Sequence, residues 1–239
     1  MGLACPGAAG LYPLAEGTYR TTRNDAAFRF ADDSSKSGKI GVSYARPSLG
    51  TLTLFYEYTS DDRPTLRFTN RIDQVGATFH RAVAPRISFD LGLSYLDARS
   101  VGLAERPYRG VGWDAAVTIR PTPRWTLRAA SDRTIVNDSL IPAAFAVQSS
   151  YDVRLEYGFA RTRLWAGGQL GGRDFRDDPR VIASPYRRDR FRDVYGGFER
   201  QIAKRVAITG EIQYFARRTD SHVNEYNDTL ATIGAKLTY

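Results

Sequence analysis

The sequence has very little sulfur, few histidines and no long apolar run. Its 239 residues include one cysteine, one methionine and two histidines. An internal disulfide is therefore excluded, and two distant histidines with a single Cys5 offer no cluster of metal ligands. No stretch approaches the roughly 18 consecutive apolar residues that a membrane-spanning helix requires. These absences exclude a helical membrane protein and a fold held together by its own disulfides.

Aromatic residues are plentiful, with 14 tyrosines and 12 phenylalanines, and apolar and polar residues alternate along most of the chain. Alternation at period 2 indicates β-strands with two different faces. In residues 206–217, one face carries Val206, Ile208, Ile212 and Tyr214, and the other carries Thr209, Glu211, Gln213 and Arg217. The expected strands are residues 17–31, 40–45, 51–59, 74–83, 87–96, 111–120, 125–132, 147–159, 164–172, 190–201, 206–217 and 229–239.

The connections between these segments alternate between short and long. Short turns are expected at residues 46–50, 83–86, 120–124, 160–163 and 202–205, and several contain the proline that tight turns favour. Long polar connections are expected at residues 32–38, 60–69, 99–106, 133–146, 174–188 and 218–225. This alternation is typical of an up-and-down meander with short periplasmic turns at one rim and long extracellular loops at the other.

The sequence therefore predicts an all-β fold, an antiparallel up-and-down transmembrane β-barrel of about twelve strands in a bacterial outer membrane. The C-terminus supports it, because Thr232, Gly234, Leu237 and Tyr239 have the spacing of the outer-membrane signal that the barrel-assembly machinery reads. An ordinary amphipathic strand that ends in tyrosine is the alternative. A soluble β-sandwich is the competing fold, because periodicity alone does not say which face is inside. The mean hydropathy of −0.39 does not decide, since a barrel with a wet lumen is about half polar.

The start of the chain adds a prediction about its organisation. Residues 1–16 lack a basic segment followed by an apolar one, so no secretory signal is visible. We expect residues 1–16 to be the remnant of a truncated start and residues 17–239 to form the barrel domain. A soluble cytoplasmic protein is the competing explanation for the missing signal.

In a barrel, the polar face of each strand points into the lumen. The predicted lumen-lining residues are Glu57, Asp90, Asp114, Arg128, Asp152, Arg154, Glu156, Arg173, Glu211, Gln213 and Lys236. They carry charges of both signs, and about twelve strands leave a narrow lumen. Mutual pairing of these charges would either plug the lumen or line a small polar channel.

Part of the net charge of +8 is concentrated between Arg173 and Arg192. The predicted basic loop consists of Arg176, Arg180, Arg187, Arg188, Arg190 and Arg192. On the extracellular side these arginines would face anionic lipopolysaccharide or an acidic glycan, since the guanidinium forms forked bonds to phosphate and carboxylate. The alternative is a solvated loop rich in salt bridges, because aspartates alternate with the arginines. Nucleic acid is not an expected partner, because no binding motif accompanies the basic residues.

Catalysis is not expected. A hydrolytic site needs a nucleophile, a base and an orienting group together. His80 lies beside a short turn, at the periplasmic end, and His222 with its neighbour Ser221 lies in a long loop. The glycines at 167, 168, 171 and 172 are not followed by a helix, so they do not resemble a phosphate loop. We predict neither enzymatic activity nor a cofactor.

The chain resembles β-barrel porins of proteobacteria that contain repeated hairpins. The resemblance is carried by residues 71–76 (RIDQVG), 84–89 (APRISF) and 91–95 (LGLSY), and residues 122–124 (TPR) and 203–205 (AKR) echo the turn. It extends from about residue 40 onward. Genes of this family often accompany those for exopolysaccharide synthesis and export, which implies a role in passing or anchoring surface polysaccharide. No functional residue carries over.

Two alternative functions, which belong to different classes, are therefore expected. The first is a passive porin-like channel or a barrel associated with exopolysaccharide export. The second is a plugged structural or adhesive barrel whose basic loop binds surface glycans or lipopolysaccharide. In both, the partners are outer-membrane lipid and, during assembly, the barrel-assembly machinery.

Overall fold

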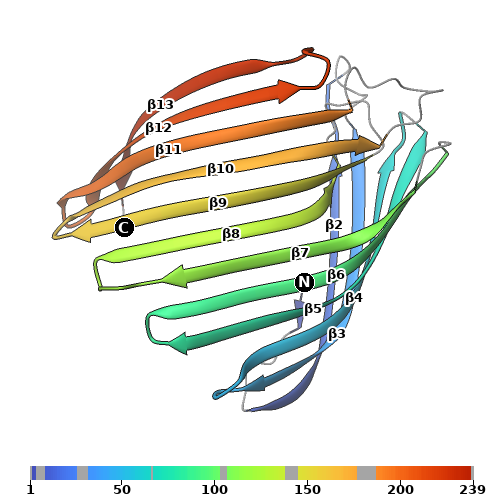
Figure 1. Cartoon of the computed structure of the whole chain (residues 1–239), viewed down its shortest axis with the longest axis horizontal. Helices are drawn as coiled ribbons and strands as arrows, with labels where there is room; N and C mark the ends of the chain where they lie inside the picture. The colour runs from blue at the N-terminus through green and yellow to red at the C-terminus, as the bar shows by residue number, and fades with distance from the viewer. Residues whose placement is uncertain are drawn as a thin grey trace.

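The computed structural model describes residues 2–3, 9–25, 32–65, 67–102, 107–137, 145–176 and 187–237. These residues form β-strands joined by turns, and the strands pair in chain order in a single antiparallel sheet (Figure 1). Among the described residues, no helix is long and apolar enough to cross a membrane. The predicted class, an all-β up-and-down antiparallel meander, is confirmed.

The strands are long. They are β1 (Gly2–Leu3), β2 (Gly10–Thr22), β3 (Asp33–Arg46), β4 (Gly50–Arg63), β5 (Phe68–Ala84), β6 (Ile87–Val101), β7 (Tyr108–Ile119), β8 (Trp125–Val136), β9 (Phe145–Phe159), β10 (Thr162–Arg176), β11 (Arg188–Ala203), β12 (Val206–Thr219) and β13 (Tyr226–Leu237). Apart from β1, each exceeds the roughly 9 to 11 residues with which a tilted strand crosses a bilayer. The tight turns after β5, β7, β9 and β11 lie together on the left of Figure 1, and we call this the turn side and the opposite end the loop side.

The first long strand differs from the prediction. It was expected at residues 17–31, whereas β2 runs from Gly10 to Thr22 and pairs with β3 from Ala45 back to Asp33. The predicted boundary after residue 16 therefore falls inside a strand. Alternation is weak here because the face that carries Leu11 also carries Pro13, Ala15 and Gly17. Residues 26–31 of the expected strand lie outside the described residues.

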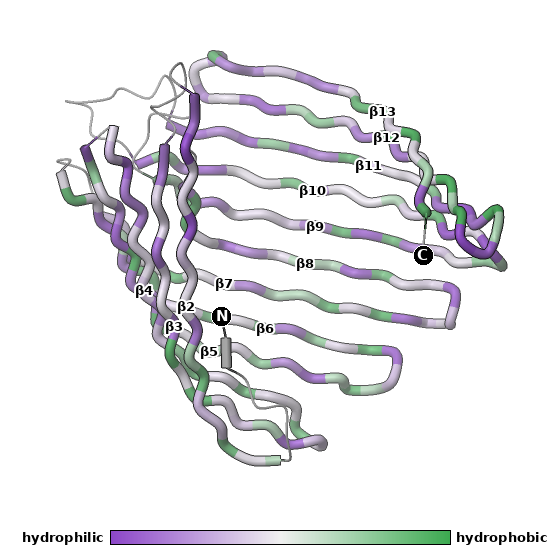
Figure 2. Tube along the Cα trace, turned by 180° about the vertical axis from the view of Figure 1, so that it is seen from behind, coloured by the Kyte–Doolittle hydropathy of each residue, from purple (hydrophilic) through white to green (hydrophobic). Residues whose placement is uncertain are grey.

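The two faces of the sheet differ in composition and in burial. One face carries Leu54, Val75 and Leu93, which are 57%, 58% and 62% exposed. The other carries Glu57, Gln74 and most of the buried side chains, including Phe55 and Asn70. The alternation is visible along the strands in Figure 2. We call the polar face the inner face and the apolar face the outer face.

The described strands leave two sheet edges. β2 pairs with β3 on one side and with the two residues of β1 on the other, and β13 pairs only with β12 among the described residues. The exposed pattern of β13 follows from this position, since nearly all of its residues are accessible. The inner face is therefore curved but not enclosed by the described strands (Figure 1).

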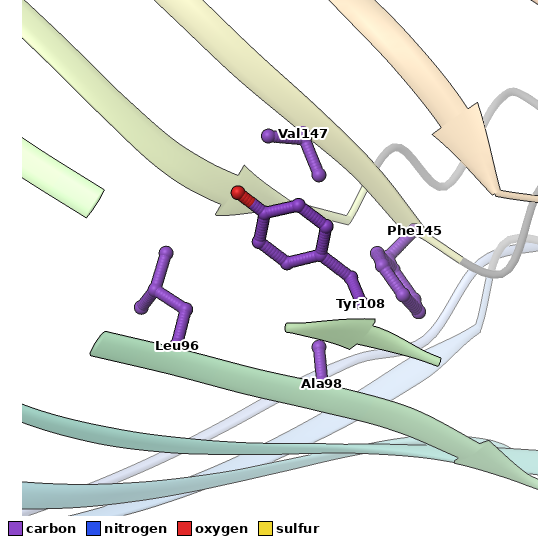
Figure 3. Packing of buried hydrophobic residues seen from close by; sticks show 5 residues of the cluster. All are labelled: Leu96, Ala98, Tyr108, Phe145 and Val147. Atoms are coloured by element: carbon purple, nitrogen blue, oxygen red, sulfur yellow. The ribbon is translucent and has the colours of Figure 1, made fainter. Parts of the chain in front are cut away.

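A small hydrophobic core lies at the loop side. Leu96, Ala98, Tyr108, Phe145 and Val147 are buried against one another (Figure 3), and Ile72 and Ile135 pack around them. The contact is possible because β7 pairs with β8 only from Trp113 to Ile119. The start of β7 thereby separates from β8, and the first residues of β9 approach β6 and β7.

Candidate functional site: the polar inner face

The predicted lumen-lining residues share one face of the sheet. Directly opposite residues in an antiparallel pair point to the same side, so the register can be followed from strand to strand. It links His80, Asp90, Ala116, Ala130, Asp152, Gln169 and Asp193 in one row across β5 to β11. The register places all of the predicted lumen-lining residues, from Glu57 on β4 to Lys236 on β13, on this inner face. Their role in lining a lumen stays a prediction.

A polar cavity occupies the turn side of the inner face. It measures about 420 Å³ and is lined by Asp90, Thr118, Arg120, Thr126, Arg128, Arg154 and Glu156. Four of these were predicted as lumen-lining residues. The Arg154 Nε donates to Glu156 Oε1 at 2.7 Å, whereas Arg128 directly opposite Arg154 has no ion pair among the described residues. Arg120 likewise has no ion pair among the described residues, so the cavity presents two unmatched cations beside the paired Arg154.

The two histidines lie far apart in the sheet order. His80 Nδ1 lies 2.5 Å from Asp90 Oδ1 on the inner face at the turn side. His222 lies in the turn between β12 and β13, where its Nδ1 is 3.2 Å from Glu225 Oε1. Both imidazoles therefore contact a carboxylate, and among the described residues no serine, threonine or cysteine side chain forms a hydrogen bond with either. The prediction that the chain is not an enzyme rests on the sequence and stays a prediction.

Glycines in β10 make room for aromatic rings on the inner face. A Cβ at Gly167 would lie 2.6 Å from the Tyr195 ring, and one at Gly171 would lie 2.3 Å from the Phe191 ring. Any larger residue would displace these rings. Close packing against aromatic rings therefore accounts for glycine at positions 167 and 171. Gly168 and Gly172 point to the outer face.

The loop side of the inner face holds a buried ion triad. Asp189 on β11 has a fully buried side chain, and its Oδ2 lies 2.6 Å from Arg173 Nη2 and 2.6 Å from Arg217 Nη2. The guanidinium of Arg173 also lies over the rings of Phe175 and Phe191 at 5.5 and 5.9 Å. The Asp189 carboxylate on β11 therefore links Arg173 on β10 to Arg217 on β12.

A hydrogen-bonded network crosses the loop side beside the hydrophobic core. Asn137, which follows β8, accepts from Asn70 Nδ2 at 3.0 Å and donates to Asp61. Ser100 donates to Asn70. Sequence analysis missed this network, because Asn137 lies in a segment predicted as a loop. Together with the core around Phe145, it joins β4, β5, β6 and β8 and narrows this end of the inner face.

Acidic side chains outnumber basic ones on the inner face. The acids are Glu16, Asp33, Glu57, Asp61, Asp90, Asp114, Asp132, Asp152, Glu156, Asp189, Asp193, Glu199, Glu211 and Asp228. The bases on the strands are Arg20, Lys39, Arg63, Arg128, Arg154, Arg163, Arg173, Arg217 and Lys236. Arg120, which follows β7 and lines the polar cavity, adds one more. The positive net charge of the chain therefore does not come from this face.

The predicted basic loop is only partly a loop. Arg176 ends β10, and Arg188, Arg190 and Arg192 belong to β11. Arg187 precedes β11, and its backbone N–H donates to the carboxylate of Asp220 at 3.1 Å. Arg180 lies outside the described residues. The three arginines of β11 point to the outer face, because Asp189 and Asp193 between and after them point inward.

The predicted assembly signal falls on the edge strand β13. Thr232 and Gly234 lie on the inner face, opposite Glu211 and Thr209. Leu237 lies on the outer face opposite Val206 and is 63% exposed. Tyr239 lies outside the described residues. Recognition by an assembly factor stays a prediction.

Aromatic residues flank the apolar outer face at two levels. Trp125, Tyr157 and Phe159 form a contiguous group at the turn side, with ring centroids 4.4 and 5.6 Å apart. Tyr95 and Tyr151 stand exposed nearer the loop side. Such girdles are typical of the two interfaces of a bilayer. Trp165 is different, because it points inward and donates to Glu211 Oε2 at 3.1 Å.

Solved structures share this fold at low sequence identity. The outer membrane channel DcaP of Acinetobacter baumannii superimposes with a TM-score of 0.61 and 14% identity, covering 95% of this chain and 71% of that one. The siderophore receptor PirA from Pseudomonas aeruginosa gives 0.56 and 10%, covering 97% and 43%. The copper transporter OprC gives 0.56 and 10%, covering 94% and 46%. No protein-family model and no curated protein matches the chain.

These comparisons establish the fold class. The antiparallel sheet of this chain is similar to that of the outer membrane channel DcaP, and the chain spans less than half the length of PirA and of OprC. Because the identities are low, the activities of those proteins do not transfer to this chain.

Proposed function

We propose that the chain forms an outer-membrane β-barrel whose polar inner face lines a passive channel for small polar solutes, with a preference for cations. The excess of acids on the inner face carries this proposal. Rings of carboxylates favour cations in a pore. The exposed apolar outer face with its aromatic levels supports the membrane setting. Closure of the inner face requires the edges of β2 and β13 to be paired, with each other or through further strands.

The membrane setting has a direct test. A closed barrel resists detergent until it is boiled, so the folded protein should migrate faster on a detergent gel before heating than after it. Solubility without detergent, with no such shift, would contradict the barrel.

Channel function is tested by reconstitution in planar bilayers under a KCl gradient. We expect a conductance whose reversal potential indicates cation preference. Asp114 and Asp228 are exposed inner-face acids with no ion pair among the described residues, so Asp114→Asn with Asp228→Asn should weaken the preference. Asp174→Asn on the outer face is the matched control and should leave it unchanged. A silent barrel would overturn the channel, and anion preference would overturn the role of the acids.

The family resemblance supports a narrower proposal, in which the barrel is associated with exopolysaccharide export. The acidic inner face favours a neutral or cationic glycan over a polyanionic one, because like charges repel at short range. Neutral oligosaccharides should interrupt the ion current transiently, whereas polyuronates of equal length should not. Current block by the polyuronate alone would contradict this assignment.

A second candidate, a barrel occluded at the loop side, is favoured by the core in Figure 3 and the network around Asn137. Here the wild-type protein would be silent. Phe145→Ala would open the core, and Asn137→Ala would cut the bridge to Asp61, so both should raise conductance from zero. If both variants stay silent while folded, the occlusion lies elsewhere.

A further inference from the structure

The arginines of β11 face outward while the acids of the same strand face inward. From Arg188 to Asp193, every second residue is an arginine. Because successive side chains of a strand point to opposite faces, the arginines lie on one face and the two aspartates on the other. Asp189 is engaged by Arg173 and Arg217, and Asp193 accepts from Gln213 at 2.6 Å. The neighbouring acids in the sequence therefore do not neutralise the outward arginines.

A fourth arginine joins them from β12. Arg218 lies directly opposite Arg190 on the outer face, and both are exposed. Like charges placed directly opposite in a sheet repel each other. We call Arg188, Arg190, Arg192 and Arg218 the outer arginine set. On one strand its members are spaced by roughly 7 Å, and Arg190 and Arg218 by roughly 5 Å between Cα atoms.

Within the set, only Arg188 has an ion pair among the described residues, with its Nε 2.8 Å from Asp174 Oδ1. The guanidinium of Arg192 lies over the ring of Tyr214 at 5.7 Å, which fixes its position without neutralising it. Arg190 faces Gly172 on β10, which has no side chain to cover it. Arg190, Arg192 and Arg218 are therefore exposed cations without an ion pair among the described residues, and the carboxylate of Glu225 lies near enough to Arg218 to interact with it electrostatically.

The position of the set relative to the apolar face indicates the kind of anion. In the next outer-face row toward the turn side from Arg192, Val194, which is 57% exposed, lies opposite Tyr214. Ile212, which is 58% exposed, lies one row further on, opposite Gly196. An anion bound by the set would thus sit at the border of the lipid-facing band, on the loop side. In an outer membrane, the anions at that depth are the phosphates of the outer-leaflet glycolipid.

We propose that the outer arginine set is a binding site for the phosphorylated sugar headgroup of the outer-leaflet glycolipid, lipopolysaccharide, whose acyl chains lie along Val194 and Ile212. Forked hydrogen bonds from guanidinium to phosphate suit this contact. The proposal depends on the outer-membrane location and is independent of whether the inner face conducts.

The test measures binding of fluorescent lipid A to the folded protein in uncharged detergent micelles. Removing one guanidinium from a charged hydrogen bond typically weakens binding roughly tenfold. Arg190→Gln with Arg218→Gln should therefore weaken binding by about two orders of magnitude. The control is Arg71→Gln with Arg99→Gln, an opposed outer pair on β5 and β6 that lies beside Asp73 and Asp97. The control should change binding less than about threefold.

Two further measurements identify which parts of the lipid the protein recognises. Lipid A stripped of its phosphates should bind the wild-type protein as weakly as intact lipid A binds the double variant. Inorganic phosphate should compete poorly, because it lacks the acyl chains. Equal binding by stripped lipid A, or equal losses in the two pairs of variants, would overturn the proposal. Unchanged heat-modifiable migration of each variant shows that folding is retained.

Discussion

Two pairs of opposed arginines stand on the outer face at the loop side, and their surroundings differ. Arg71 faces Arg99 across β5 and β6, and in the adjacent row Asp73 faces Asp97. Arg99 Nη2 lies 3.6 Å from Asp73, and Arg109 Nε lies 3.1 Å from Asp97. Arg190 faces Arg218 across β11 and β12, but its adjacent row on the side of the apolar band holds Arg192 and Ala216.

The difference comes from a change of one residue in the sequence separation between opposite charges. In Arg71 and Asp73 the opposite charges are two positions apart and share a face, as they do in Asp97 and Arg99. In Asp189 and Arg190 they are adjacent and point to opposite faces. Two segments of similar composition therefore produce two different rims. On β5 to β7 two aspartates offset two of three arginines, and we call this the neutral rim; on β11 and β12 the rim is cationic.

The largest effect is expected at the inward acid of the cationic segment. Asp189→Asn should lower the free energy of unfolding by about 3–5 kcal/mol, because it leaves Arg173 and Arg217 buried without their shared anion. Asp174→Asn removes an exposed partner of Arg188 and should cost under about 1 kcal/mol. Urea unfolding in detergent, followed by tryptophan fluorescence, measures both. Equal urea midpoints for the two variants would show that the buried inward acid contributes no more to stability than the exposed outward one.

The second-largest effect is expected from a substitution that converts the cationic rim into a neutral one. Arg192→Asp places a carboxylate two positions from Arg190 on the same face, which reproduces the spacing of Arg71 and Asp73. One cation is lost and a second is matched, so lipid A binding should weaken more than tenfold, or over about 1.4 kcal/mol. Arg200→Asp, also on the outer face of β11 but near the turn side, is the control. A similar loss in both variants would point to overall charge and away from the local row.

The same alternation explains which features of the fold and of the candidate site could be predicted from the sequence. The strand class, the meander and the shared face of residues from Glu57 to Lys236 depend only on period 2 and turn chemistry, which are local. The outward direction of Arg188, Arg190 and Arg192 was available from that period too. It was overlooked because these arginines were assigned to a basic loop, although the expected strand at residues 190–201 already contained Arg190 and Arg192.

Other features depend on contacts between distant strands. The departure of β7 from β8 before Trp113 brings Phe145 against Leu96, and no local pattern encodes it. Trp165 lies near a strand end, a position that favours a lipid interface, but its register with Gly197 turns it inward toward Glu211. The start of β2 at Gly10 was missed because pairing with β3 overrides a weak pattern.

A smaller effect is expected from the reverse conversion. Asp73→Asn with Asp97→Asn removes the acids paired with Arg99 and Arg109 and leaves Arg71 with no acid two positions away, so the neutral rim becomes cationic. Binding of lipid A should rise up to about fivefold, which corresponds to the roughly 1 kcal/mol upper value of an exposed ion pair. Stoichiometry from native mass spectrometry should increase by one bound lipid at saturation. If stoichiometry and affinity stay at wild-type values, unmatched arginines alone do not make a site.

The smallest effect concerns the turn that borders the cationic rim after Arg218. There the backbone N–H of Thr219 donates to Glu225 Oε1 at 3.0 Å, and His222 Nδ1 lies 3.2 Å from the same oxygen. The Thr219 N–H, with a smaller contribution from His222, lowers the pKa of Glu225 below its ordinary value of 4.5. A lowered pKa means that the carboxylate stabilises the folded turn fully above pH 4.5, and that this contribution is lost as the pH falls through the lower value. Amide exchange of residues 219–225 should therefore be slower in the wild type than in Glu225→Gln at pH 6, and the two should converge at acid pH. A difference that persists at pH 2 would contradict this, because the wild-type carboxyl would then still be ionised or would not be what holds the turn.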